Sequence, residues 1–322
     1  MGAARLLPGL GMAVIIAAVA TYLGSLVPSL GAPVFAVLVG FFASSGARRR
    51  PEFRLGVDLA KGRLLQVAVV LLGVQLSLRE VLDVGWHSLP VLVSTLVVCL
   101  VLAQVVGTRL GIDADLRTLI GVGTGICGAS AIATVSPVIK AKSADVAYAI
   151  STIFLFNVAA VVVFPAVGHA LGMSQHDFGL FAGTAVNDTS SVVAAATAFG
   201  TAAAGYAVVV KLTRTLAIIP ITVYLGLRHG EAEVRHAWRL VPWFLTGFVV
   251  VVLLNTAGLI PDAVTSPVHH LDAFLVATAL AAIGISTDVP ALRRAGAKPL
   301  LLGLILWAAV TVTSLVVGAI AA

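Results

Sequence analysis

The sequence predicts an all-α polytopic membrane protein, because apolar residues dominate it and few charges remain to face water. Hydrophobic residues make up 60% of the 322 positions and charged residues only 11%. A soluble domain carries roughly 25% charged residues, more than twice that share. The mean hydropathy is +1.09. Both cysteines, Cys99 and Cys127, fall in apolar segments, which argues against a disulfide framework.

Eleven apolar windows of membrane-spanning length follow one another along the chain. They cover residues 9–28, 33–47, 60–78, 88–108, 118–139, 147–171, 178–199, 205–226, 241–259, 270–287 and 299–321. Continuous apolar runs of this kind predict helices rather than the strands of a membrane barrel. The first window is long enough to be a span rather than a cleaved signal peptide. The longest polar stretch, residues 228–239, is only a loop, so residues 1–322 are expected to form a single transmembrane domain.

Lysine and arginine are distributed unequally between the two sides that eleven crossings define. With the N-terminus inside, only Arg79, Lys140 and Lys142 fall outside. The inside set of fifteen residues is Arg5, Arg48, Arg49, Arg50, Arg54, Lys61, Arg63, Arg109, Arg117, Arg228, Arg235, Arg239, Arg293, Arg294 and Lys298. This positive-inside bias predicts a cytoplasmic N-terminus. The net charge of +6 is therefore a topology signal, and no nucleic-acid partner is expected.

The charge rule also allows a second topology. If residues 118–141 and 178–204 were re-entrant hairpins from opposite faces, Lys140 and Lys142 would also lie inside. Every other assignment would be kept. Eleven spans, and nine spans with two hairpins, are therefore both open.

A weak internal repeat relates residues 71–93 to residues 282–304. The aligned pairs are Gly73 with Gly284, Ser77 with Asp288, and Gly85 with Gly296. The charge rule gives the two segments opposite directions through the membrane. Similar sequence with opposite direction is typical of the inverted repeats of secondary transporters, so residues 1–322 are expected to be one transporter domain.

Two apolar windows are interrupted by glycine and small polar residues: GVGTGICGASAIATVSPVI (121–139) and FAGTAVNDTSSVVAAA (181–196). A broken helix frees backbone N–H and C=O groups, and its second half presents N–H donors with a positive dipole end. We expect non-helical backbone around residues 123–128 and 183–188, with a further break at Ser136-Pro137. The alternative is that these small residues only pack helices together.

Buried charge favours a binding site over simple packing. Of the fourteen acids, Asp188 alone lies well inside an apolar window, and the next window carries Lys211 and Arg214. An ionisable group at such depth is a functional hypothesis by default. If Asp188 pairs with one cation, the other is left for an anion; a closed salt-bridge cluster is the structural alternative. Asn157, a further mid-span amide, is expected either to bond a carbonyl freed at a break or to join two helices.

The predicted substrate-binding residues come from the two interrupted segments and from the helix that follows them. They are Gly123, Thr124, Gly125, Cys127, Gly128, Ala129, Ser130, Asn187, Asp188, Thr189, Ser190, Ser191, Lys211 and Arg214, supported by Asn157, Ser136 and Pro137. None of the seven histidines shows metal-ligand spacing, so no metal and no cofactor are expected.

With these motifs the chain resembles the YeiH family of bacterial inner-membrane proteins, to which sulfate export has been attributed. The resemblance runs nearly end to end and includes the central GTGICGASAIATVSPVI block and the KLTR helix. It implies an inner-membrane location and a distant similarity to the sodium/proton antiporter and bile-acid transporter folds, where a broken helix crosses its inverted counterpart. Many members carry a His-Glu pair where this chain has Asn187-Asp188, which leaves a proton-coupling role of that pair open here.

The leading functional hypothesis is a secondary transporter that exports a small inorganic or organic anion such as sulfate or sulfite. The alternative is a cation/proton antiporter in which Asp188 carries the ion or proton. No P-loop, H-E-x-x-H or G-x-S-x-G motif is present, which argues against ATP drive and against an enzyme. The expected partners are the lipid bilayer, the anion and a coupling proton or cation; a homodimer is left open.

Overall fold

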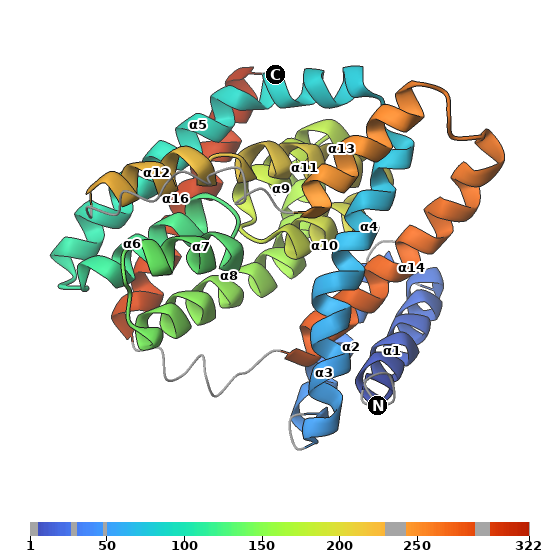
Figure 1. The fold of residues 1–322 in the computed structure, drawn as a ribbon, viewed down its shortest axis with the longest axis horizontal. Helices are drawn as coiled ribbons and strands as arrows, with labels where there is room; N and C mark the ends of the chain where they lie inside the picture. The colour runs from blue at the N-terminus through green and yellow to red at the C-terminus, as the bar shows by residue number, and fades with distance from the viewer. Residues whose placement is uncertain (1–5, 27–30, 48–49, 229–242, 287–296, 322) are drawn as a thin grey trace. The chain divides into compact units, whose positions relative to one another are not determined.

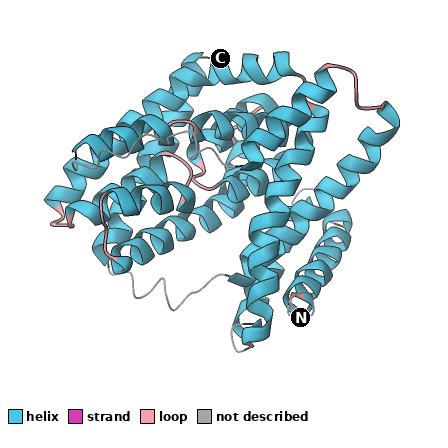
Figure 2. Ribbon diagram, viewed as in Figure 1, coloured by secondary structure: helices cyan, strands magenta, loops and turns pink. Residues whose placement is uncertain are grey.

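The computed structural model describes residues 6–26, 31–47, 50–228, 243–286 and 297–321 (Figure 1). Over these ranges the chain forms helices joined by short turns, and it contains no strand there (Figure 2). Six of the described helical segments, one of them the consecutive pair over Thr201–Arg228, are long and apolar enough to cross a membrane. The all-α fold class predicted from the composition is therefore confirmed.

The chain divides into two compact units, which are described separately. The first comprises residues 1–81, 193–205 and 243–288. Its helices are α1 (Leu7–Leu26), α2 (Gly31–Ala47), α3 (Arg54–Leu59), α4 (Leu65–Leu72), α13 (Trp243–Thr256) and α14 (Asp262–Ser286). A 3-10 turn (Pro51–Phe53) precedes α3, a π-helical turn (Ala60–Leu64) joins α3 to α4, and a 3-10 turn (Gly73–Gln75) follows α4.

Helices α2 and α14 of this first unit approach each other at glycine. A Cβ atom on Gly40 would lie 2.3 Å from the Ala281 carbonyl oxygen, and one on Gly284 would lie 2.3 Å from that of Val37. Only glycine permits such close backbone contact, which is how small residues pack helices in membranes. Gly284 therefore has a packing role of its own, independent of its place in the predicted repeat.

The second unit comprises residues 82–192, 206–242 and 289–322. Its helices are α5 (Leu78–Arg109), α6 (Ala114–Gly125), α7 (Ala129–Val138), α8 (Ser143–Ala170), α9 (Gln175–Ala185), α10 (Thr189–Phe199), α11 (Thr201–Thr215), α12 (Ile218–Arg228) and α16 (Ala297–Ala321). Residues 78–81 of α5, 193–199 of α10 and 201–205 of α11 belong to the first unit. Across the two units, each predicted apolar window corresponds to one helix or to two consecutive helices.

Helices α6 and α7 fold back on each other (Figure 1). Ala114, at the start of α6, and Ile139, directly after α7, line the same pocket. Between them, a Cβ on Gly123 would lie 2.9 Å from the Ile132 side chain. Helices of 12 and 10 residues are only about 15–18 Å long, roughly half the thickness of a bilayer core. The pair is therefore a helical hairpin whose two ends lie close together.

Proline explains one interruption that the sequence interpretation missed and rules out one that it predicted. Pro220 has no N–H to donate to the Leu216 carbonyl, and the chain turns at residues 216–217, between α11 and α12. Pro137, in contrast, lies inside α7, which continues to Val138. The predicted second break at Ser136-Pro137 is therefore wrong, because a proline in the last helical turn removes only one bond.

Candidate functional site

The first break separates α6 from α7. Helix α6 continues to Gly125, two residues further than the predicted start of the break, and α7 begins at Ala129. Ile126 leaves the helix with φ −120° and ψ −90°. Gly128 has φ +70°, a left-handed backbone that favours glycine. Its N–H donates to the Gly123 carbonyl at 2.9 Å, which closes the turn.

The second break separates α9 from α10. Helix α9 ends at Ala185, Val186 is extended with φ −86° and ψ 135°, and α10 begins at Thr189. The extended backbone turns the Val186 carbonyl out of the helix. The chain is therefore non-helical over residues 186–188, at the end of the region where a break was predicted.

The two breaks lie against each other. A Cβ atom on Gly128 would be 3.3 Å from Cβ and 3.4 Å from Cα of Asp188. Since Gly128 directly precedes α7 and Asp188 directly precedes α10, the N-termini of the two helices start side by side. The two segments that the sequence marks as interrupted are therefore in contact with each other within the second unit.

Lys211 connects the two breaks through a single ammonium group. Its Nζ donates to the Ile126 carbonyl at 2.8 Å and to the Val186 carbonyl at 2.9 Å. The side chain is fully buried, at 0% exposure, so it does not extend to the membrane surface. One positive charge thus binds the carbonyls that both breaks expose.

Arg214, one helical turn further along α11, binds the last turns of the half-helices α6 and α9. Its Nε donates to the Gly125 carbonyl at 2.7 Å and its Nη2 to the Thr124 carbonyl at 3.0 Å. Its Nη1 donates to the Thr184 carbonyl on α9. A buried cation at a helix C-terminus neutralises the negative dipole end as well as the unpaired carbonyls.

These bonds change the predicted roles of the three buried charges. No ion pair joins Asp188 to Lys211 or Arg214 among the described residues. Asp188 is partly exposed, and its Oδ2 accepts from the Ser190 N–H at 3.1 Å. Pairing of Asp188 with one cation is therefore wrong, and so is the closed salt-bridge alternative. Lys211 and Arg214 both donate to backbone carbonyl oxygens instead.

Asn157 on α8 fixes the second break. Its Oδ1 accepts from the backbone N–H of Asn187 at 3.2 Å and of Asp188 at 3.3 Å. The expectation that Asn157 serves a helix break is supported, but the amide accepts from N–H groups rather than donating to a carbonyl. The neighbouring Asn187 is 1% exposed, and its Oδ1 has no partner among the described atoms.

Unused donors gather at the starts of α7 and α10. The backbone N–H groups of Ala129, Ser130, Thr189 and Ser191 have no acceptor within the described part of the chain. Ala129 and Ser130 are exposed, and Thr189 and Ser190 are partly exposed, whereas Ser191 is buried. The site therefore has an accessible side at the helix N-termini and a buried side formed by Lys211 and Arg214.

The remaining predicted residues take supporting positions. The Thr124 and Gly125 carbonyls bind Arg214, while Cys127 is a buried free thiol inside the first break. Ser136 lies in the last turn of α7 and donates to the Ala133 carbonyl at 3.4 Å, so Ser136 and Pro137 lie at the end of α7 that is remote from the break.

Comparison with known proteins places the chain in a family. The family model described as "Conserved hypothetical protein 698" matches residues 8–303. The chain belongs to this family, UPF0324, which is the YeiH family. A "UPF0324 membrane protein" of Streptococcus agalactiae is 43% identical over 98% of this chain and 97% of its own length. Proteins of the same name from Streptococcus pyogenes and Fusobacterium nucleatum are 42% and 38% identical, over 97% and 95% of this chain.

The match confirms the resemblance found in the sequence motifs. The relatives' printed name states only that they are membrane proteins. Together with the long apolar helices, it establishes this UPF0324 chain as a multi-pass membrane protein. The inner-membrane location and the cytoplasmic N-terminus remain predictions. Arg5, Arg48, Arg49, Arg235, Arg239, Arg293 and Arg294, which carry part of the orientation argument, lie outside the described residues.

Sequence reasoning missed two features of the UPF0324 chain. Thr184, in the last turn of α9, shares a hydrogen bond of 2.5 Å with Ser314 on α16. Asp272 lies mid-way along α14 and is 6% exposed, with no partner for Oδ1 among the described atoms. Asp188 is thus not the single acid that lies well inside an apolar segment. The apolar window was started at residue 270, eight residues after α14 begins, so Asp272 was taken for a span end.

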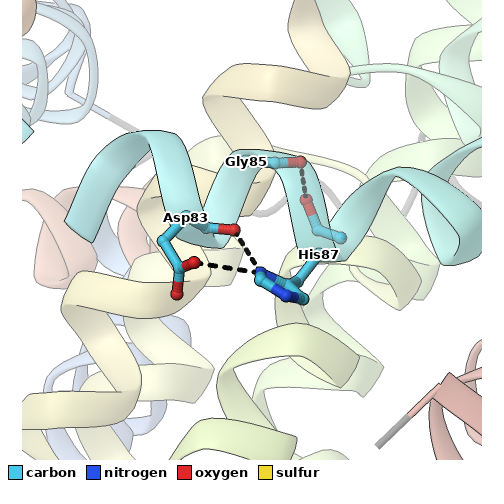
Figure 3. A network of polar contacts seen from close by, with 4 residues as sticks. Asp83, Gly85 and His87 are labelled. Carbon is cyan, nitrogen blue, oxygen red and sulfur yellow. Dashed lines mark hydrogen bonds and ion pairs between the residues drawn. The ribbon is translucent and has the colours of Figure 1, made fainter. Parts of the chain in front are cut away.

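Several of the seven histidines lie on helices. His87 is on α5, where its Nδ1 lies 2.8 Å from the Asp83 carbonyl and 3.3 Å from Asp83 Oδ1 (Figure 3). Its side chain is 64% exposed. No cluster of three or more potential metal ligands occurs in the described ranges. His229 and His236 lie outside those ranges.

Proposed function

We propose that this UPF0324 protein is a secondary transporter of a small anion, and that the anion binds where α7 and α10 begin. The observation that carries the proposal is the adjacency of Gly128 and Asp188, which brings the unused N–H donors of two helix N-termini together. Such donors, with the positive ends of two helix dipoles, form an anion site without any side-chain cation.

The charge balance supports an anion. Lys211 and Arg214 contribute two positive charges and Asp188 one negative charge. Each helix end carries about half a charge, so the C-termini of α6 and α9 and the N-termini of α7 and α10 cancel. The side chains then leave one net positive charge near the site. Asp188 directly precedes α10, is partly exposed, and is the group that would carry a coupling proton.

The proposed topology is nine spans with two re-entrant hairpins, in an inverted-repeat architecture. Its support is the α6–α7 hairpin, whose two ends line one pocket. This arrangement puts Lys140 and Lys142 on the same side as Arg109 and Arg117, which completes the positive-inside pattern. Substrate binding at paired broken helices near the bilayer midplane is typical of secondary transporters. No P-loop is present in the sequence, and the proposal includes no enzymatic activity.

Export of a sulfate-like oxyanion is the specific form of this proposal, and it rests on the family's attributed activity. The competing function is cation/proton antiport with Asp188 as the carrier. The observation that favours it is that carbonyl oxygens occupy both buried cations, while the Asp188 carboxylate is accessible.

Substitution of Ala129 by proline tests the anion site. Proline is tolerated at the first position of a helix, and it removes only the backbone N–H that we assign to the anion. We expect Ala129→Pro to weaken sulfate or sulfite binding about tenfold, the value of one hydrogen bond to a charged group. Binding is measured as a ligand-induced rise in apparent Tm of the purified protein at constant ionic strength. Ala129→Ser keeps the N–H and is the matched control. Equal binding by both variants would contradict the site.

Cysteine accessibility tests the topology. Single cysteines at Arg79, Arg109 and Lys140 are introduced and exposed to a membrane-impermeant thiol reagent in intact cells; the native Cys99 and Cys127 are buried. We expect labelling at position 79 and protection at positions 109 and 140 until the cells are opened. Labelling at 140 together with 79 would instead show that α6 and α7 cross the membrane.

A further inference from the structure

The other end of the α6–α7 hairpin carries a second polar pocket, which we call the α6 pocket. Its volume is about 330 Å³, and it lies between α5, α6 and α12, all within the second unit. Its polar lining consists of Gln104, Asp115, Arg117, Thr118, Tyr224 and Arg228. Gly121 and Val122, one turn before the residues that bind Arg214, also line it.

Arg117 is held in place on the wall of this pocket. Its Nε donates to Gln104 Oε1 at 2.9 Å and its Nη1 to the Ile112 carbonyl at 3.2 Å. Gln104 is itself oriented, because its Nε2 donates to Thr118 Oγ1 at 3.2 Å. The rest of the guanidinium is therefore presented in a fixed direction. A preorganised guanidinium fork matches the geometry of a phosphate or sulfate group.

Further donors face the same space. Arg228 Nη1 lies 3.5 Å from the Tyr224 hydroxyl, and both side chains are exposed. The first turn of α6 also lines the pocket, and its N-cap residue Asp113 makes no side-chain cap. The N–H groups of Ala114 and Asp115 are therefore left for a ligand. Asp115 contributes the one negative charge among these lining groups, against two arginines.

We propose that the α6 pocket binds an oxyanion of the phosphate or sulfate type, separately from the site at α7 and α10. Its volume fits a hydrated free oxyanion or the headgroup of an anionic phospholipid. The basic residues on this side of the hairpin place it at the membrane surface that the charge rule assigns to the cytoplasm. The proposal does not depend on the transported substrate, since it uses none of the residues assigned to that site.

The test uses purified full-length protein carrying Ala129→Pro, so that the proposed transport site contributes little. Apparent Tm is measured with sodium sulfate or phosphate against sodium chloride at equal ionic strength. In a second arm it is measured with dioctanoyl phosphatidylglycerol against dioctanoyl phosphatidylcholine. We expect at least one oxyanion-bearing ligand to raise Tm. Arg117→Gln and Arg228→Gln should each weaken the affinity for that ligand, obtained from the dependence of Tm on ligand concentration, at least about tenfold. Arg109→Gln, an exposed arginine nearby in sequence that does not line the pocket, should leave it unchanged.

The two arms identify the source of the oxyanion. A shift with free sulfate or phosphate only assigns a soluble anion, a shift with phosphatidylglycerol only assigns a headgroup, and a shift with both assigns the shared group. The proposal is overturned if no oxyanion exceeds its control, or if Arg109→Gln reduces the effect as much as Arg228→Gln. Among the described residues, the hydrogen bond of Arg228 is to the Tyr224 hydroxyl, and its side chain is exposed, so Arg228→Gln remains informative even where Arg117→Gln does not fold.

Discussion

Arg214→Ala is expected to destabilise the protein strongly, although no carboxylate pairs with the arginine. The substitution leaves the carbonyls of Thr124, Gly125 and Thr184 without their donors. Arg214 is 2% exposed, so water cannot readily replace it. Hydrogen bonds to a charged group contribute about 1.5–3 kcal/mol each, and their loss is not additive. We therefore expect a loss of at least about 3 kcal/mol.

The measurement is thermal unfolding in detergent without added ligand, followed by tryptophan fluorescence. Arg228→Ala is the matched control, because Arg228 is exposed at the end of α12 and should change stability by no more than about 0.5 kcal/mol. Arg214→Lys should lie between the two, since one ammonium cannot reach three carbonyls on two helices. A Tm of Arg214→Ala equal to that of the Arg228→Ala control would show that the carbonyls find other partners, and that Arg214 does not hold α6 and α9 together.

Asp188→Asn is expected to separate the two candidate functions while keeping the fold. The amide oxygen that replaces the carboxylate can still accept from the Ser190 N–H, so the start of α10 should be preserved. If the substrate is an anion, removing a negative charge beside it should leave binding unchanged or tighten it by up to about tenfold, while coupling to a proton is lost. If the substrate is a cation, binding should be abolished.

The readout is again the ligand-induced rise in apparent Tm, with sulfate and sulfite in one series and sodium and potassium in another. Glu52→Gln, which removes an exposed acid from the 3-10 turn of the first unit and touches neither proposed anion site, controls for the general effect of one lost charge. A cation-induced shift that disappears in Asp188→Asn, with no anion active on either protein, would reject the anion transporter.

Much of the fold could be predicted from the sequence, because hydrophobicity over some twenty residues is a strong signal for a helix in a membrane. The location of both breaks was also predictable, since glycine and small polar residues interrupt otherwise apolar windows. Their exact extent was not, because Gly123 and Gly125 tolerate helix and the chain leaves it only at Ile126. The turn before Pro220 was missed because hydrophobicity continues through it.

The roles of the buried charges could not be predicted in the same way. Charge counting favoured pairing Asp188 with Lys211 or Arg214, since opposite charges are the simplest partners. The structure satisfies both cations with carbonyls, and these oxygens become available only because the helices end where they do. Every residue carries a backbone carbonyl, so the residue types in the sequence do not show which carbonyls will accept from a buried cation. Asn157 was identified as important for the opposite reason, since an amide in an apolar helix is rare.

The position of Lys211 constrains how the proposed transport cycle can proceed. One ammonium binds a carbonyl from Ile126 and one from Val186, sixty positions apart in the chain. Any step that moved these two carbonyls apart would break at least one hydrogen bond to the buried ammonium group. The two breaks, at residues 126–128 and 186–188, are therefore expected to move together as one rigid body that Lys211 of α11 holds together. Access to the ligand would then alternate by movement at the boundaries of this body and not by opening it.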